Sequence, residues 1–442
     1  MRRIKVINCK GQAIIYVTIG VVVLILFVGL ALDSGIGYIV KTKLNSAVDA
    51  AAIAAGRALS EGGTTAAEQA ANKFFYANFP AGYMSAQITS GPTTNLSQDA
   101  QGRWHISVSA TAVVPTYFLK IRAMNTFTVN SSAEAVKRDL DLAFVQDTTG
   151  SLLSVFSDVK MDAVRFINKF DETTDRVSLI HFAYGAAVDD PIRTSSRGFN
   201  KTSVVNHINS FSASGNTNYA EAFWRAKDQL DSIPSSLRSN IRAIVFFSDG
   251  SPNTFSSTFT GTSPCAATPP GNPGVIVTGD GPGSPSGLDR IGSVSGAPTG
   301  CTASRVTAMP AFFNLGSGIG DNTFHVTNPP SGQGINPRPV TSTVNFDNVN
   351  NAARNLPEEM ASSARDAGIY VYTIGLGPLL TTNKSWGNHE RGDTVLKNMA
   401  NDPSAPNHTP GQLEGLYCYA ADTNQLNACF DEIASQIFRL TR

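Results

Sequence analysis

Three kinds of hydrophobic pattern follow one another along this chain. The first is an unbroken apolar run, AIIYVTIGVVVLILFVGLAL, at residues 13–32, which carries no charge. Apolar residues then recur in three- and four-residue steps, which predicts a helical face that continues the run, as one helix or with a break near Gly35–Gly37. The members of this face are Ile36, Val40, Leu44, Val48, Ala52, Ala55 and Leu59.

A period of two replaces the helical period after residue 103. From Trp104 to Ala112, apolar residues alternate with polar ones, which is the pattern of a half-buried strand. Residues 113–119 and 127–136 supply two further predicted strands. A long helix followed by a small antiparallel sheet is a pilin-like layout, and we expect it over residues 33–138.

From Leu140 onward, apolar runs alternate with amphipathic segments, which predicts an α/β domain over residues 139–442. The sheet should be mostly parallel and doubly wound, with helices on both faces. The predicted strands are Leu140–Val145, Val177–Phe182, Ala243–Phe247, Ile369–Ile374 and one near Leu416–Ala420. The predicted helices are Leu152–Phe170, Ser203–Phe211, Tyr219–Leu230, Val349–Ala367, Thr394–Met399 and Gln425–Leu440.

The regularity lapses at about residues 254–346, where abundant Gly and Pro oppose both helix and sheet. This segment follows directly after Asp249. We expect an insertion that is either a tolerated surface loop or a specificity loop over the adjoining site.

Charges around the apolar run predict a membrane topology. The run is about long enough to cross a bilayer. Asp33 follows it, and the basic residues before it are Arg2, Arg3, Lys5 and Lys10. The positive-inside rule therefore predicts a cytoplasmic tail (residues 1–12), a transmembrane helix (residues 13–32) and a periplasmic bulk at the bacterial inner membrane.

Two processing alternatives are disfavoured. A cleaved signal peptide would have a shorter apolar run and an Ala-x-Ala site after it. A prepilin-like cleavage at Gly11 would be accompanied by Glu five residues on, where this chain has Tyr16. A retained single-span anchor is the better interpretation.

Cysteine usage agrees with export, and the composition gives no sign of nucleic-acid binding. Acidic and basic residues balance at 34 each, without the basic clusters of a nucleic-acid-binding protein. Cys9 precedes the apolar run, and an even set follows it, which predicts disulfides. Connectivity is not fixed by the sequence, but nearest neighbours give Cys265–Cys301 and Cys418–Cys429. The spacings fit no zinc-knuckle pattern.

Three separated fragments place oxygen donors just past a predicted strand or at the start of a helix. They are Asp147-Thr-Thr-Gly-Ser151, Thr217 within Ser214–Asn218, and Asp249 after the strand at Ala243–Phe247. Ligands of open α/β sheets collect beyond the carboxyl ends of such strands. Hard oxygens without His or Cys suit Mg²⁺ rather than Zn²⁺. The alternative for each aspartate is a turn cap.

The three fragments resemble the von Willebrand factor type A domain and its metal-ion-dependent adhesion site, whose pattern is Asp-x-Ser-x-Ser, then Thr, then Asp. The residues that match are Asp147, Thr149, Ser151, Thr217 and Asp249. Thr149 replaces the usual Ser, which keeps the hydroxyl but adds a methyl group. The resemblance implies a bound Mg²⁺ or Mn²⁺ with one open position, which an acidic side chain of a partner protein would fill.

The segment from Asp33 to Ala52, with Asp49 in its Ala-rich part, resembles the N-terminal region of TadE/TadG-like Flp pilus-assembly proteins. The two resemblances in tandem imply a TadG-like envelope protein that assembles or anchors Flp-type pili and is not an enzyme. One alternative is a surface adhesin that uses the same site on an external protein.

A metal-dependent hydrolase is the third and least favoured interpretation. Asp139-Leu-Asp141 is similar to the paired aspartates of phosphate-transferring enzymes, but its charges fall before the strand and Ala143 stands where Thr is expected. His181 lies inside an apolar strand and is predicted to be structural. No nucleophile and base pair stands out.

Overall fold

The structure is a computed structural model, and the chain divides into two compact units, residues 1–137 and 138–441, each with its own hydrophobic core. Cys9 and most of the expected cytoplasmic tail lie outside the residues that the structure describes. Those residues are 10–99, 104–122, 124–137, 139–262, 272–278, 283–316, 323–327, 338–382 and 390–440.

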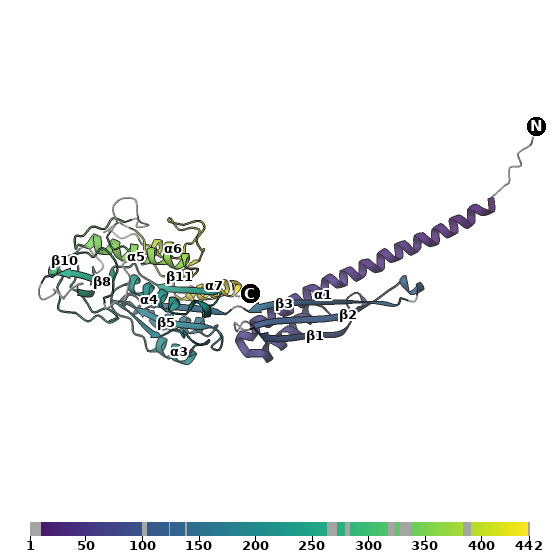
Figure 1. Cartoon of the computed structure of the whole chain (residues 1–442), viewed down its shortest axis with the longest axis horizontal. Coiled ribbons are helices and arrows are strands. Elements are labelled where there is room, and N and C mark those ends of the chain that lie inside the picture. The colour runs from purple at the N-terminus through teal and green to yellow at the C-terminus, as the bar shows by residue number, and fades with distance from the viewer. Residues whose placement is uncertain are drawn as a thin grey trace, which may run out of the picture. The chain divides into compact units, whose positions relative to one another are not determined.

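The first unit is built on one long helix, α1 (Lys10–Asn78), drawn in purple in Figure 1. The helix continues through Gly35–Gly37 without the break that was one of the two expectations. Its departure from helical geometry comes later, at Gly63, where φ is 69°. Within the described residues, one helix is long and apolar enough to cross a membrane, and most side chains from Ile14 to Leu32 on it are exposed.

Three antiparallel strands lie along α1 in the order β1-β2-β3 (Figure 1). They are β1 (Gln87–Gln98), β2 (Trp104–Pro115) and β3 (Thr126–Lys137). The alternating residues of β2 from Ile106 to Val114 are buried against the face of α1 from Val40 to Leu59. This packing confirms both the helical period and the period of two.

One expectation for this sheet is wrong, and one strand was missed. Residues 113–119 are not a separate strand, because residues 113–115 complete β2 and Leu119 begins a short 3-10 helix, η2 (Leu119–Arg122). Strand β1 was not predicted, because its residues are polar and most of its side chains are exposed or half-buried. A strand that buries no apolar face leaves no periodic signal in the sequence.

The second unit is a six-stranded sheet in the order β12-β11-β7-β4-β5-β6. Five strands are parallel, as expected: β4 (Leu140–Asp147), β5 (Arg176–Phe182), β7 (Ile241–Ser248), β11 (Tyr370–Leu376) and β12 (Tyr417–Ala420). The edge strand β6 (Ala186–Asp190) is antiparallel to β5 and was not predicted. Its short, half-polar sequence carries too little pattern to reveal it.

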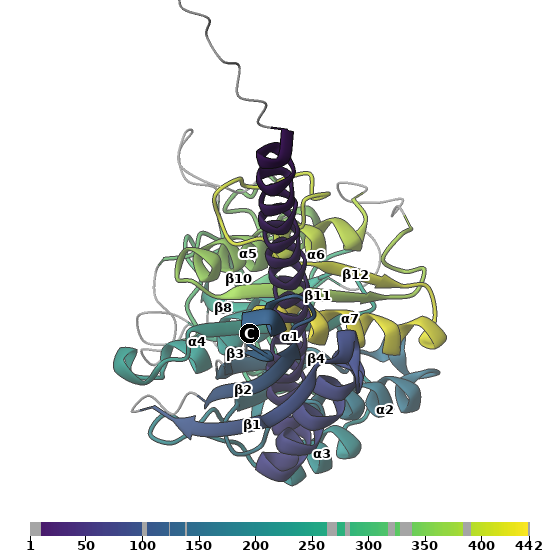
Figure 2. The same ribbon diagram turned by 90° about the vertical axis from the view of Figure 1, so that its right-hand side faces the viewer.

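Helices cover both faces of this sheet (Figure 2). One face packs against α4 (Tyr219–Asp231), α5 (Phe346–Asp366) and α6 (Gly392–Ala400). The other packs against α2 (Phe156–Ile167), α3 (Lys201–Ser210) and α7 (Thr423–Leu440). The helix expected from Leu152 begins at Phe156, because Gly150–Leu152 forms a 3-10 turn, η3.

The Gly/Pro-rich insertion contains a small sheet, so the expectation that its composition opposes strands is wrong. The antiparallel strands β8 (Thr254–Gly261), β9 (Asn272–Val277) and β10 (Val306–Ala308) lie in the order β10-β8-β9. Phe255 and Phe259 of β8 are buried in the main core, which holds the strand in place. Pro273 is tolerated because β9 lies at the edge of the sheet.

Candidate metal centre

The centre lies where two neighbouring parallel strands end. Strands β4 and β7 pair in register, so their carboxyl ends lie side by side. Asp147 is the last residue of β4, and Asp249 directly follows β7. The turn after β4 begins with a hydrogen bond of 2.7 Å from the Thr149 backbone N–H to Asp147 Oδ1. This bond fixes the carboxylate and directs the next residues across the end of β7.

Two hydroxyls link that turn to the second carboxylate. Ser151 Oγ donates to Asp249 Oδ1 at 2.7 Å. Thr149 Oγ1 lies 3.0 Å from Ser151 Oγ and 3.5 Å from Asp249 Oδ1. The structure therefore brings four of the five predicted ligands, Asp147, Thr149, Ser151 and Asp249, into one connected cluster.

The fifth residue, Thr217, comes from the loop before α4. This loop is held to the β4 turn by backbone bonds from Ser214 N–H to the Thr148 carbonyl (2.8 Å) and from Gly150 N–H to the Gly215 carbonyl (3.1 Å). A Cβ placed on Gly250 would lie 3.4 Å from Thr217 Oγ1. The Thr217 hydroxyl therefore lies beside the residue that follows Asp249.

Three residues that support the cluster were not predicted. The Ser248 hydroxyl donates to Asp147 Oδ2. The Thr217 backbone N–H donates to Asn253 Oδ1 at 3.0 Å, and the Tyr219 hydroxyl donates to the Gly250 carbonyl at 2.6 Å. Ser248 adjoins Asp249 in the sequence and could have been suspected, whereas nothing in the spacing of Asn253 or Tyr219 points to the cluster.

The electrostatics of the cluster favour a bound cation. Both carboxylates are buried. Burial raises the pKa of Asp147 to about 6, and burial together with the charge of Asp147 raises the pKa of Asp249 to about 8. Within the described residues, neither carboxylate forms an ion pair with Lys or Arg. A divalent cation would supply the missing positive charge, so this all-oxygen donor set fits Mg²⁺ or Mn²⁺.

Outside this cluster, the candidate chemistry considered from the sequence has structural explanations. Asp141 accepts from Arg176 Nη1 at 3.1 Å and from the Ser239 backbone N–H at 2.7 Å, so it joins β4 to its neighbours. His181 Nδ1 lies 2.6 Å from Asp189 Oδ2. No group of three or more His, Cys, Asp and Glu side chains that could hold a metal is found in the described part of the chain.

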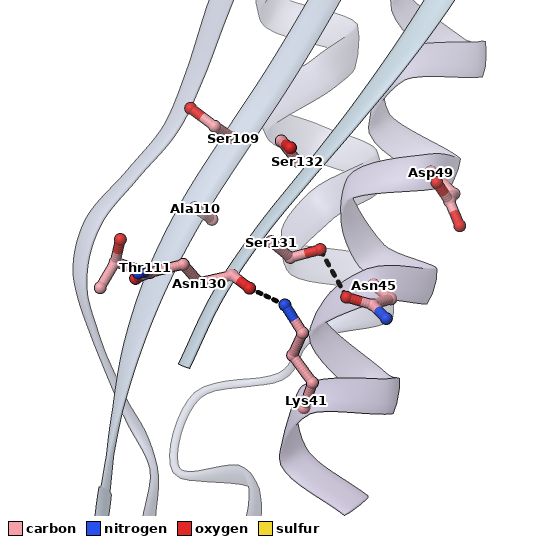
Figure 3. A pocket seen from close by; sticks show the side chains of 9 residues that line it. All are labelled: Lys41, Asn45, Asp49, Ser109, Ala110, Thr111, Asn130, Ser131 and Ser132. Carbon is pink, nitrogen blue, oxygen red and sulfur yellow. Dashed lines mark hydrogen bonds between the residues drawn. The ribbon is translucent and has the colours of Figure 1, made fainter. Parts of the chain in front are cut away.

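A polar recess lies in the first unit, between α1 and the strands (Figure 3). Its volume is about 460 Å³ and its lining is polar. Lys41 Nζ donates to the Asn130 carbonyl, and Ser131 Oγ donates to Asn45 Oδ1 at 2.7 Å (Figure 3). Asp49 lies at the same recess with an exposed side chain. Because these hydrogen bonds join the helix to the sheet, we interpret the recess as part of the polar contact between α1 and the strands rather than as a ligand site.

The expected pairing of Cys418 with Cys429 is present and joins β12 to α7, with a Cα–Cα distance of 5.5 Å. Cys301 is also disulfide-bonded. Cys265, its predicted partner, lies outside the described residues.

Comparison with known families agrees with the fold and with both resemblances. Residues 141–309 match the von Willebrand factor type A domain, and residues 11–58 match the Flp pilus-assembly TadE/G-like family. The second unit is thus a von Willebrand factor A domain with a mixed α/β sheet. Joined to a TadE/G-like segment, it gives the chain the TadG-like architecture expected from the sequence. No curated protein matches the chain.

Several solved structures are similar in fold. The von Willebrand factor domain of the type V pili tip protein Mfa5 from Porphyromonas gingivalis is 16% identical with a TM-score of 0.40, over 70% of this chain and 98% of that one. The PilB minor pilin from Streptococcus sanguinis is 15% identical with a TM-score of 0.39, over 81% and 79% of the two chains.

A mussel byssus protein, proximal thread matrix protein 1, has a zinc-occupied adhesion-site motif. It is 12% identical with a TM-score of 0.34, over 68% of this chain and 46% of that one. At these scores the three similarities carry no functional argument.

Proposed function

We propose that this protein is a membrane-anchored envelope component that assembles or anchors Tad/Flp-type pili and binds a protein partner through the metal centre. The observation that carries the proposal is the combination of a TadE/G-like apolar helix with a cluster of two buried carboxylates and three hydroxyl residues. In this proposal the N-terminus is cytoplasmic and the bulk is periplasmic, and the chain is not an enzyme.

The residues of the centre have distinct roles in this proposal. Thr149, Ser151 and Thr217 would offer neutral hydroxyl ligands, while Asp147 and Asp249 would bind the cation directly or through water. Where an aspartate binds through water, the direct ligands are mainly neutral, and a bound Mg²⁺ or Mn²⁺ would keep positive charge for a further anionic ligand. An acidic side chain of a pilus or secretion component could then complete the coordination shell. Ser248 would hold Asp147 in position by its hydrogen bond.

A pull-down of the full chain from detergent-solubilised envelopes tests this function. The same component should be captured in Mg²⁺ by wild type, lost in chelator, and lost by Asp249→Ala. Asp158→Ala is the matched control, because Asp158 is an exposed carboxylate of α2. Capture that is indifferent to both chelator and Asp249→Ala would contradict the proposal.

The adhesin alternative uses the same site on an external protein. It differs in location, because the von Willebrand factor A domain would then be exposed at the cell surface. Metal-dependent binding of purified protein to a host matrix, without capture of an envelope component, would favour that alternative.

A further inference from the structure

The loop between β2 and β3 is bound to α1 at the point where the apolar run ends. Asp33, the first charged residue after that run, is buried. Its carboxylate accepts three backbone N–H bonds, from Tyr117 (2.9 Å), Phe118 (3.0 Å) and Leu119 (2.8 Å). Three charge-assisted bonds on one carboxylate make this a specific attachment of the loop to the helix.

The loop also reaches past Asp33 onto the apolar run itself. A Cβ placed on Gly29 would lie 2.5 Å from Phe118 Cβ, so the Phe118 side chain can approach α1 this closely only because residue 29 is glycine. Gly29 precedes Asp33 by one helical turn, which is about 6 Å along the helix axis. Phe118 therefore contacts a part of α1 that belongs to the predicted membrane span.

The loop presents apolar side chains that remain partly exposed in the first unit. Among described residues of this unit, Tyr117 is 53% exposed, Met124 is 52% exposed and Phe118 is 39% exposed. Lys120 is exposed beside them. Aromatic residues with a nearby cation are typical of the membrane–water interface, where ring and ammonium find apolar and anionic surroundings.

From these contacts we infer that the β2–β3 loop (residues 116–122 and 124–125) is a second membrane-contacting element, seated in the interfacial layer of the bilayer that α1 crosses. The inference rests on the proposed membrane anchor and adds a site to it. The occupant is the lipid surface, because the loop is continuous with the apolar run through Gly29 and Asp33. Tyr117, Phe118 and Met124 contact the acyl and glycerol region, and Lys120 lies among the lipid phosphates.

Spin-label depth measurements test this inference on the full chain in bilayers of phosphatidylethanolamine and phosphatidylglycerol. Single cysteines at Tyr117 and Met124, in a Cys9→Ser background and without reductant, carry the nitroxide. Tyr76→Cys is the matched control, because Tyr76 is 51% exposed in the same unit but belongs to the part of α1 after Gly63, outside the apolar run. We expect a several-fold higher ratio of oxygen to nickel-chelate accessibility at positions 117 and 124 than at position 76.

A label at Leu24→Cys separates failure of the loop from failure of the anchor. If the label at position 24 reports a lipid environment while positions 117 and 124 have the same accessibility ratio as position 76, the loop inference is overturned and the anchor stands. If the label at position 24 reports an aqueous environment, both the proposed membrane anchor and the loop inference are overturned. In addition, Gly29→Leu should displace Phe118 and lower the accessibility ratio at position 117. An unchanged ratio would overturn the role of this contact.

Discussion

Thr149 is the one position of the centre at which this chain departs from the family pattern, and its hydroxyl lies within hydrogen-bond range of Ser151. Thr149→Ser keeps that hydroxyl and should retain or tighten Mg²⁺ binding. Thr149→Val keeps the shape but removes the oxygen, so binding should weaken at least tenfold, about 1.4 kcal/mol. Titration calorimetry with Mg²⁺ and Mn²⁺ measures both. Equal affinities of the two variants would show that Thr149 is not a ligand.

The paired carboxylates predict a stability that depends on metal. At a free Mg²⁺ concentration 100 times the Kd, the free energy of unfolding of wild type should rise by about 2.7 kcal/mol. Asp249→Asn should lose this increase. In chelator it should unfold no more easily than wild type, because burial and the charge of Asp147 disfavour an ionised carboxylate at this position and Asn cannot ionise. Urea denaturation with and without Mg²⁺ gives both values. A variant that keeps the full Mg²⁺ increment would rule out Asp249 as part of the site.

His207 on α3 predicts a pH-dependent contribution in the second unit. Its Nδ1 lies 2.7 Å from Asp190 Oδ2, and this hydrogen bond raises the pKa of His207. A raised pKa in the folded state stabilises below the ordinary value of about 6.5, and that contribution is lost as pH rises through the folded value. His207→Gln should therefore cost stability at about pH 5.5 and little at about pH 9. Because His207 is partly exposed, the cost should stay under about 1 kcal/mol. Equal costs at both pH values would refute the assignment.

Among the elements, β12 and α7 are joined covalently by a disulfide in the C-terminal part of the second unit. Replacing both Cys418 and Cys429 by Ala should lower the free energy of unfolding by about 2–4 kcal/mol, since the loop is no longer closed in the unfolded chain. Denaturant unfolding measures this, with Cys9→Ala as the control that should change nothing. Identical unfolding curves for the double variant and wild type would contradict the prediction.

Elements with an apolar period were predictable, and those without one were not. The five parallel strands and six helices of the second unit have buried faces, so their residues repeat at the matching period. Strands β1 and β6 bury little, and β8 depends on Phe255 and Phe259 reaching a core assembled from distant segments. The candidate ligands could be named from a motif, whereas Asn253 and Tyr219 act through backbone contacts that only the folded chain creates.

For the whole molecule, the charge asymmetry around residues 13–32 predicts a single span with everything after Asp33 exported. Alkaline phosphatase fused after Val136 should be active in cells, because that enzyme folds only outside the cytoplasm. A fluorescent protein that folds only in the cytoplasm should be dark at the same position. The reverse pair of readings would invert the proposed topology.

Helix α1 passes from the apolar run into the core of the first unit without an intervening linker. A flexible linker would let the first unit change its orientation, and it would extend under load before any force reached the apolar run. Here Asp33 binds the β2–β3 loop to the same helix, so no flexible segment lies between the sheet and the proposed membrane span. A pull on the sheet would thus be transmitted along α1 directly to the proposed membrane span.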